Sequence, residues 1–182
     1  ETAVWQGTAA SNSIPFNGFE VLANADGSVV DVAKAAITAA NVTTELGKVV
    51  DAIPQTIYGK DELYIYVPTA IYQAYVRALG GFGAAGTSNV TAGVDDKMNT
   101  WYRNQQELYF DGIKLLHCPG MTATDMVATT KDNLIFGTSL FSELNQAEII
   151  DGASWGSQNS RVVLRGSAGV TLGIGSEVVL YS

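Results

Sequence analysis

One short segment of the sequence has the residue types and spacing of a catalytic nucleophile. Residues 152–156, Gly-Ala-Ser-Trp-Gly, match the Gly-x-Ser-x-Gly pattern of serine hydrolases, in which a turn between a strand and a helix exposes the serine. No helical pattern follows Ser154, and the single histidine, His117, precedes it, whereas the histidine of those hydrolases follows the serine. We interpret the segment as a turn with a chance match and keep a serine hydrolase using Ser154 as an alternative function.

A second pattern is typical of dinucleotide sites. Residues 81–86, Gly-Phe-Gly-Ala-Ala-Gly, match Gly-x-Gly-x-x-Gly, whose glycines normally follow a strand and open a helix that holds a pyrophosphate. Here they follow a predicted helix and open a polar, glycine-rich stretch, although Glu107 lies at about the distance of a ribose partner. We therefore expect a surface loop over 80–100 and no bound cofactor.

The remaining reactive side chains do not form a recognisable site. His117 and Cys118 are neighbours, and neighbours in an extended strand point to opposite faces, so they are poorly placed to share a proton. We expect His117 at the exposed end of a strand and Cys118 as a packed side chain. Asp95, Asp96 and Asp111 lack the spacing of a calcium loop. The sequence thus predicts no catalytic residue and no metal site.

Composition restricts the partners. The 182 residues carry 10 basic and 18 acidic side chains, a net charge of −8, and 47 % are hydrophobic. Binding to nucleic acid of any sequence, or to anionic membranes, relies on clustered positive charge, so we expect neither. There is no run of about 18 apolar residues, so we expect no transmembrane helix. The chain begins at Glu1 without a leader, and we expect a fragment or a processed form.

The elements that would position these side chains are clearest in the middle of the chain. Apolar residues at helical spacing before Pro54 predict a helix over 41–54. The run Leu-Tyr-Ile-Tyr-Val predicts a strand over 63–67. Pro68 follows, at a place where the start of a helix tolerates proline, and the next residues predict a helix over 70–79.

Further strands are predicted in the second half of the chain. Asp111-Gly112 is a tight-turn signal between strands over 107–110 and 113–117. The other predicted elements are a strand over 2–7, a pair of short strands over 125–130 and 133–136 around Lys131-Asp132, a weak helix over 139–147, and strands over 160–166 and 169–181. Together they indicate an α+β chain with mostly antiparallel pairing.

The order of these elements resembles the major capsid proteins of tailed bacteriophages, whose fold is shared with encapsulins. The matching pieces are Val67-Pro68 before a helix, the segment from Gly112 to Pro119, and the segment from Asn133 to Gly137, followed by closing strands. The resemblance covers about residues 42–182, and the order of the pieces carries it. It implies a phage major-capsid-type fold, mostly the axial domain with returning strands of the peripheral domain.

The same resemblance implies a division of the chain. Residues 1–41 would be an N-terminal extended segment of the peripheral region, 42–145 an axial-type α+β domain, and 146–182 the returning strands of the peripheral domain. The N-terminal arm and the spine helix of the family are not readable in this chain, which fits the expectation of a fragment.

The function implied by the resemblance is structural. We expect a non-enzymatic subunit of a bacteriophage or prophage capsid, present in the virion, assembled in the bacterial cytoplasm from copies of itself, with portal or scaffold proteins as further candidate partners. Candidate assembly contacts are Phe82, Trp101, Tyr102 and Trp155, because aromatic side chains often anchor interfaces. A carbohydrate-binding surface module, suggested by loop Trp and Tyr residues, and a cargo-loading compartment shell of similar fold remain alternatives.

Overall fold

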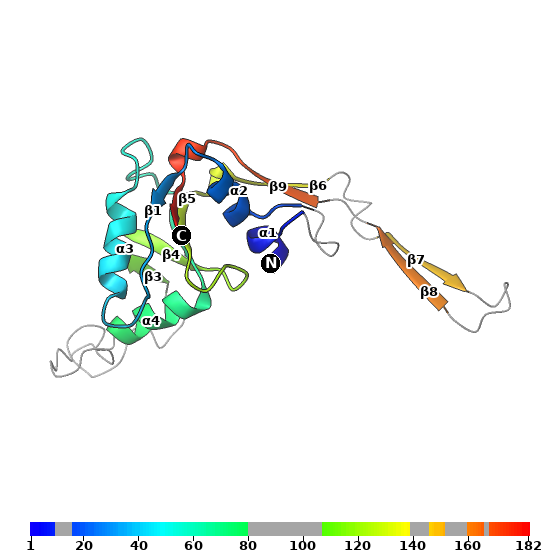
Figure 1. Ribbon diagram of the computed structural model, residues 1–182, viewed down its shortest axis with the longest axis horizontal. Helices are drawn as coiled ribbons and strands as arrows, with labels where there is room; N and C mark the ends of the chain where they lie inside the picture. The colour runs from blue at the N-terminus through cyan, green and yellow to red at the C-terminus, as the bar shows by residue number, and fades with distance from the viewer. Residues whose placement is uncertain (10–15, 80–106, 139–145, 152–159, 166–167) are drawn as a thin grey trace.

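The computed structural model describes residues 1–9, 16–79, 107–138, 146–151, 160–165 and 168–182 (Figure 1). Its helices are α1 (Thr2–Gln6), α2 (Phe19–Ala25), α3 (Val42–Asp51) and α4 (Thr69–Leu79), with 3-10 turns η2 (Lys131–Asn133) and η4 (Gly175–Glu177). Its strands are β1 (Val30–Val32), β2 (Leu63–Val67), β3 (Leu108–Phe110), β4 (Ile113–His117), β5 (Met126–Thr130), β6 (Leu134–Thr138), β7 (Gln146–Asp151), β8 (Ser160–Arg165), β9 (Ala168–Leu172) and β10 (Val179–Tyr181). The helices, with strands β1 to β5 and β10, make up the body, and β6 to β9 form a ribbon that projects from it (Figure 1).

The predicted helix over 41–54 is confirmed as α3. Val42, Leu46 and Val49 are fully buried, which is the helical spacing that the sequence displays. The Asn41 side chain accepts hydrogen bonds from the Thr38 backbone N–H and hydroxyl, and this fixes the turn that enters the helix. The helix ends just before Pro54, as expected.

The strand–proline–helix unit and the tight hairpin are also confirmed. β2 precedes Pro68, α4 follows it, and α4 buries Ile71 and Tyr75 against the sheet. β3 and β4 are joined at Asp111 and Gly112, whose φ angles are 49° and 77°. Two consecutive positive φ values are what a two-residue hairpin turn of the I′ type requires.

Within the described residues, six strands form the sheet of the body in the order β1-β10-β5-β2-β4-β3. β1 runs parallel to β10 and β2 parallel to β4, and the other neighbours are antiparallel. α4 lies between the parallel strands β2 and β4 in the chain order, since parallel neighbours need a long crossover connection. The sheet is therefore mixed, with antiparallel pairs in the majority, and the α+β prediction is confirmed.

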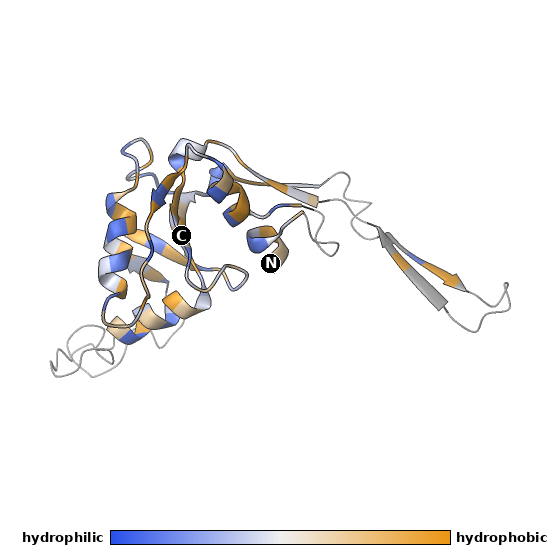
Figure 2. Cartoon of the chain, in the orientation of Figure 1, coloured by the Kyte–Doolittle hydropathy of each residue, from blue (hydrophilic) through white to orange (hydrophobic). Residues whose placement is uncertain are grey.

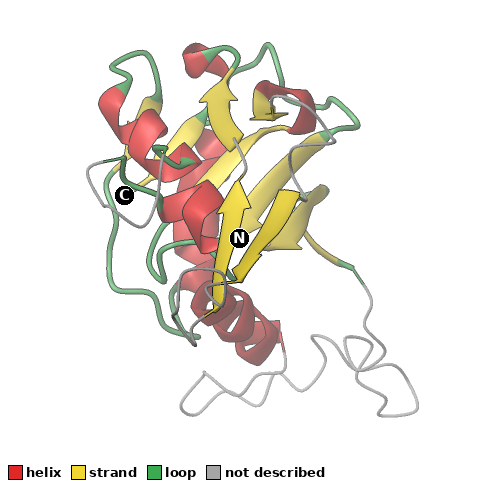
Figure 3. Ribbon diagram, turned by 90° about the vertical axis from the view of Figure 1, so that its right-hand side faces the viewer, coloured by secondary structure: helices red, strands yellow, loops and turns green. Residues whose placement is uncertain are grey.

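Both faces of this sheet are covered, and each cover has its own apolar cluster. α3 and α4 pack on one face, where Leu46, Ile65 and Tyr181 are buried. α1 and α2 lie on the other face, where Trp5 and Phe19 pack together. Figure 2 shows hydrophobic residues of the sheet between the two helical layers, and Figure 3 views the body from the side of the ribbon.

The ribbon consists of two strand pairs that lie outside the main sheet. β6 pairs with β9 from Leu134↔Leu172 to Thr138↔Ala168, and β7 pairs with β8, both antiparallel. The β7–β8 pair lies farther from the body than the β6–β9 pair (Figure 1). An isolated pair of strands is at best marginally stable in water, so the ribbon lacks the kind of support that the sheet receives from its helices.

Three expectations about the elements are wrong. The segment 2–7 is the helix α1 rather than a strand, because a helical turn seats Trp5, which is 8 % exposed, on Phe19 and Tyr66. The strands near 125–130 and 133–136 do not pair with each other, because η2 turns the chain between them: β5 pairs with β2 and β10, and β6 with β9.

The third concerns the segment 169–181, which is not one strand, because η4 separates β9 from β10. Residues 139–145 of the predicted weak helix lie outside the described residues, and Gln146 already begins β7.

Candidate assembly surface

One buried side chain holds both strands of the ribbon at its root. Asn133 is the last residue of η2 and immediately precedes β6, whereas Ile174 follows shortly after β9. The Asn133 Nδ2 group donates to the Ile174 carbonyl at 2.9 Å and to the Thr129 hydroxyl at 3.0 Å, and its Oδ1 accepts from the Ile174 N–H at 2.6 Å. The position where the ribbon leaves the body is thus fixed by a fully bonded amide.

The glycine beside this amide leaves room for it. A Cβ atom on Gly173 would lie 2.7 Å from Asn133 Oδ1, closer than side-chain contacts normally allow. The Gly173 N–H also donates to the Asn133 carbonyl at 3.0 Å. Close packing of the segments around Asn133 and Gly173 therefore depends on the absence of a side chain at position 173.

Beyond its root, the first strand pair exposes large apolar residues. Leu134 and Leu172 still pack against the cluster of Trp5 and Phe19. Ile135 and Phe136, the next residues of β6, are 45 % and 53 % exposed. Since successive side chains of a strand point to opposite faces, apolar surface lies open on both faces of the ribbon.

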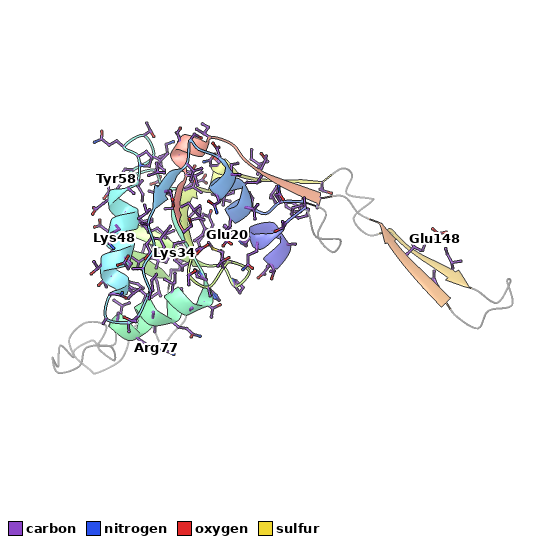
Figure 4. All side chains as sticks on the ribbon, in the orientation of Figure 1. Glu20, Lys34, Lys48, Tyr58, Arg77 and Glu148 are labelled. Atoms are coloured by element: carbon purple, nitrogen blue, oxygen red, sulfur yellow. The ribbon has the colours of Figure 1, made fainter. Side chains whose placement is uncertain are left out.

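The second strand pair repeats this arrangement. Ile149 and Ile150 of β7 are 72 % and 42 % exposed, and they too are consecutive. In register, Ile149 pairs with Val162 and Glu148 with Val163. Figure 4 places Glu148 on the ribbon, far from the labelled side chains of the body. Exposed, adjacent apolar residues on a projecting ribbon are the kind of surface that marks a contact with another molecule.

A shallow groove on the body is a second exposed surface, with tyrosine rings in its lining. Tyr58 and Tyr109 are each 53 % exposed and border a hollow of about 410 Å³ that also includes Tyr64 and Lys114. The Tyr109 hydroxyl donates to Glu107 at 2.9 Å, and Lys114 pairs with the same carboxylate. The Lys114 hydrogen bond holds the pKa of Glu107 below its usual range. The groove therefore presents tyrosine rings beside an ion pair.

The reactive groups of the body have structural partners. The His117 ring bonds the Thr69 hydroxyl at 2.8 Å and is exposed at the end of β4, as expected. Burial raises the pKa of the Cys118 thiol to about 11, so it stays protonated at neutral pH and is a poor nucleophile. Among the described residues, no three His, Cys, Asp or Glu side chains gather as a metal site, and no helix is long and apolar enough to cross a membrane.

Two buried carboxylates bind backbone and side-chain donors on opposite faces of the sheet. Glu20 accepts hydrogen bonds from the Thr122 N–H at 2.9 Å and the Thr122 hydroxyl at 2.7 Å. Burial raises the pKa of Glu20. Glu45 accepts from Lys48 at 2.9 Å and from the Tyr181 hydroxyl at 2.8 Å. These bonds lower its pKa. Both residues tie separate segments of the chain together.

Most of the site residues named from the sequence fall outside the described residues. These are Phe82, Trp101, Tyr102 and Trp155 among the assembly contacts, Ser154 of the hydrolase alternative, the glycines of 81–86, and Asp95 with Asp96. Sequence reasoning did not identify Ile135, Phe136, Ile149 or Ile150. A sequence signal for them was present, because two consecutive apolar residues break the alternation of apolar and polar residues that a strand with one face in water shows.

Comparisons with known proteins place the fold. No family model and no curated protein sequence matches the chain. A solved structure from Mycobacterium phage Che8 matches with a TM-score of 0.60 and 9 % identity, over 85 % of this chain and 53 % of that one. The capsid asymmetric unit of cyanophage A-1(L) matches with a TM-score of 0.58 and 13 % identity, over 99 % and 63 %. A virus-like particle from Pyrococcus furiosus matches with a TM-score of 0.53 and 6 % identity, over 88 % and 58 %.

These likenesses are structural, because the identities are too low to carry more than the fold. The chain spans between 53 and 63 % of the length of the three chains named above. The element order that suggested a phage capsid protein is matched by the arrangement of the same elements in space. The chain has the fold of phage and virus-like-particle capsid proteins.

Proposed function

We propose that this chain is a structural subunit of a bacteriophage or prophage capsid, which assembles by contacts between copies of itself. The observation that carries the proposal is the ribbon, which exposes apolar residues on both faces while the body is closed around its own core. A capsid fold whose projecting ribbon exposes apolar residues is suited to burying that surface against neighbouring subunits. The virion is the corresponding location, and assembly would precede release from the bacterial cytoplasm.

The proposal assigns no catalysis to the chain. What supports this is the state of the reactive groups: His117 bonds Thr69, the Cys118 thiol is held protonated, and Glu20 and Glu45 are engaged in structural hydrogen bonds. Ser154 lies outside the described residues, and the sequence order of Ser154 and His117 does not favour the hydrolase alternative.

The domain division belongs to the proposal as well. We assign 1–41 to the peripheral region, 42–145 to the axial region around the capsomer axis, and 146–182 to returning strands. Within the last segment, β7, β8 and β9 are in the ribbon, whereas β10 is a strand of the main sheet. Phe82, Trp101, Tyr102 and Trp155 are proposed as further contacts between copies, and portal or scaffold proteins as further partners.

Sedimentation velocity and negative-stain electron microscopy test the proposal directly. The purified chain is compared over a wide range of concentration and salt, together with an Ile149→Ser variant. We expect the parent chain to form rings or shells above a threshold concentration, and the Ile149→Ser variant to remain monomeric at concentrations where the parent chain assembles. A cooperative thermal transition in both proteins serves as the control for folding. A parent chain that stays monomeric throughout would contradict the proposal.

A further inference from the structure

Three side chains form a row across neighbouring strands of the main sheet. In register, Lys114 of β4 pairs with Tyr64 of β2 on one side and with Tyr109 of β3 on the other. Paired residues of neighbouring strands point to the same face of a sheet. The two tyrosines therefore stand on one face with the lysine between them.

The row becomes more exposed toward the edge strand β3. Tyr64 is half-buried, because it packs against the cluster of Trp5 and Phe19. The Lys114 side chain is 27 % exposed, and Tyr109 is 53 % exposed. The row thus begins beside a packed cluster and ends as accessible surface.

A further tyrosine makes the row one side of a groove. Tyr58, in the segment between α3 and β2, is 53 % exposed and lines the same hollow of about 410 Å³ as Tyr64, Tyr109 and Lys114. Sites for small molecules typically measure about 300–1,000 Å³. Three tyrosines from separate segments of the chain therefore share one hollow of a size that suits a small ligand.

The Tyr109 ring is held in place by its own contacts. Its hydroxyl donates to Glu107 at 2.9 Å, and the same carboxylate pairs with Lys114. A side chain that is already fixed loses less conformational entropy when a ligand binds. The exposed Tyr109 ring is thus a pre-organised surface for stacking.

The charges of the groove favour an uncharged ligand. Two lysines and two aspartates lie in its lining, so neither sign predominates there. They are Lys60, Lys114, Asp61 and Asp111. A site for phosphate or a nucleic-acid strand relies on an excess of positive charge, and Lys114 is already paired with Glu107.

A sugar ring combines the two properties that this lining can satisfy. Its C–H faces are apolar and suit tyrosine rings, and its hydroxyl groups can bond to ammonium and carboxylate groups. We propose that the groove binds a neutral saccharide, with one sugar ring on Tyr109 and hydroxyl groups bonded to Lys114 and Asp61. This binding site is additional to the proposed capsid function and does not depend on assembly.

Saturation-transfer NMR with four neutral trisaccharides tests the proposal. Maltotriose, cellotriose, mannotriose and triacetylchitotriose are each added to the full chain below its assembly concentration. We expect at least one to bind, with a dissociation constant on the order of 1 mM, because the groove is shallow. The affinity should be the same in about 50 and 500 mM NaCl, since a neutral ligand has no charge for salt to screen. No transfer to any of the four would overturn the proposal.

Substitutions of equally exposed aromatic residues locate the binding. Tyr109→Ala removes the stacking ring, and Phe136→Ala removes a ring of the same 53 % exposure on β6, outside the groove. We expect Tyr109→Ala to weaken binding by about fivefold or more and Phe136→Ala by less than about twofold. Equal effects would place the sugar elsewhere and contradict the assignment. If Tyr109→Ala does not fold, Tyr58→Ala, at an equally exposed loop residue, decides the question in the same way.

Two charged probes separate a saccharide from an anionic ligand. Inorganic phosphate and single-stranded oligothymidylate are titrated under the same conditions, and we expect neither to bind. Binding of either probe that weakens as salt rises and is lost in Lys114→Met would replace the saccharide by an anion. None of these outcomes bears on the capsid proposal, which is tested by assembly of the parent chain in the absence of sugar.

Discussion

The body and the ribbon place similar strands in opposite surroundings. In the body, β5 is enclosed by helices on both sides, and its three apolar residues, Met126, Val127 and Ala128, are inaccessible to water. In the ribbon, β7 carries adjacent isoleucines that are 72 % and 42 % exposed. The contrast indicates that the free energy of folding of the chain resides mostly in the body.

The largest expected effect separates the two regions by stability. Leu46→Ala removes a fully buried side chain of α3, and we expect it to lower the free energy of unfolding by about 2–5 kcal/mol. Ile149→Ala should change it by less than about 0.5 kcal/mol, since the side chain is exposed in a single molecule. Urea denaturation below the assembly concentration measures both. A large loss of stability in Ile149→Ala would remove the distinction between the regions.

The root where the two regions meet should show an intermediate effect. Asn133→Ala removes a buried amide and leaves the partly buried Ile174 N–H and carbonyl without their partner, and we expect a loss of about 1–3 kcal/mol. Asn24→Ala, at an exposed position of α2, is the matched control and should be nearly neutral. Denaturant titration followed by circular dichroism checks both. Equal effects would mean that the Asn133 amide does not hold the root.

Substitutions at two glycines test how tightly the root is packed without removing a hydrogen-bonding group. Gly173→Ala would bring a Cβ atom to 2.7 Å from Asn133 Oδ1, whereas a Cβ on Gly169 of β9 has nothing within 4 Å. We expect Gly173→Ala to cost about 1–3 kcal/mol by overpacking and Gly169→Ala to cost less than about 0.5 kcal/mol. Thermal unfolding of the two variants gives the comparison, and similar melting temperatures would show that the root accommodates a methyl group.

The smallest expected effect is a pH dependence confined to the body. Burial raises the pKa of Glu20 above 4.5, against the opposing effect of its two hydrogen bonds from Thr122. Its stabilising contribution is therefore present below pH 4.5 and is lost as pH rises through the raised value. The pKa of Glu45 is lowered, so its contribution is present above pH 4.5 and is lost as pH falls through the lowered value.

Two isosteric variants separate these contributions. Relative to the parent chain, Glu20→Gln should gain stability as pH rises above 4.5, and Glu45→Gln should lose stability as pH rises toward 4.5. Melting temperatures across that range, measured on the monomer, decide the signs. Slopes of the same sign for both variants would show that the two carboxylates do not differ in the way their contacts imply.

Local signals in the sequence were sufficient for α3, the unit from β2 to α4, and the β3–β4 hairpin. In each case the residues that define the element are neighbours in the chain, such as Asp111-Gly112 at the turn. α1 and α2 were not predicted, because helices of 5 and 7 residues are not stable alone. They exist because Trp5 and Phe19 pack on each other and Trp5 packs on Tyr66 of β2, contacts between distant parts of the sequence.

Strand pairing and the candidate surface needed the structure for a similar reason. Nothing near β5 in the sequence specifies that its neighbours are β2 and β10. The apolar pair Ile149-Ile150 is visible in the sequence, yet in that form it equally fits a strand in the middle of a core. Only the exposed fractions of the two side chains distinguish a projecting strand from a central one.

The position of β10 affects the order in which the protein can form during translation. β10 lies between β1 and β5 in the sheet, but it follows the whole ribbon along the chain. A ribosome therefore releases the ribbon before the strand that joins β1 to the rest of the sheet. Nascent chains therefore expose Ile149 and Ile150 while the sheet is still incomplete. Polysomes that carry many such chains are where aggregation before folding is favoured most.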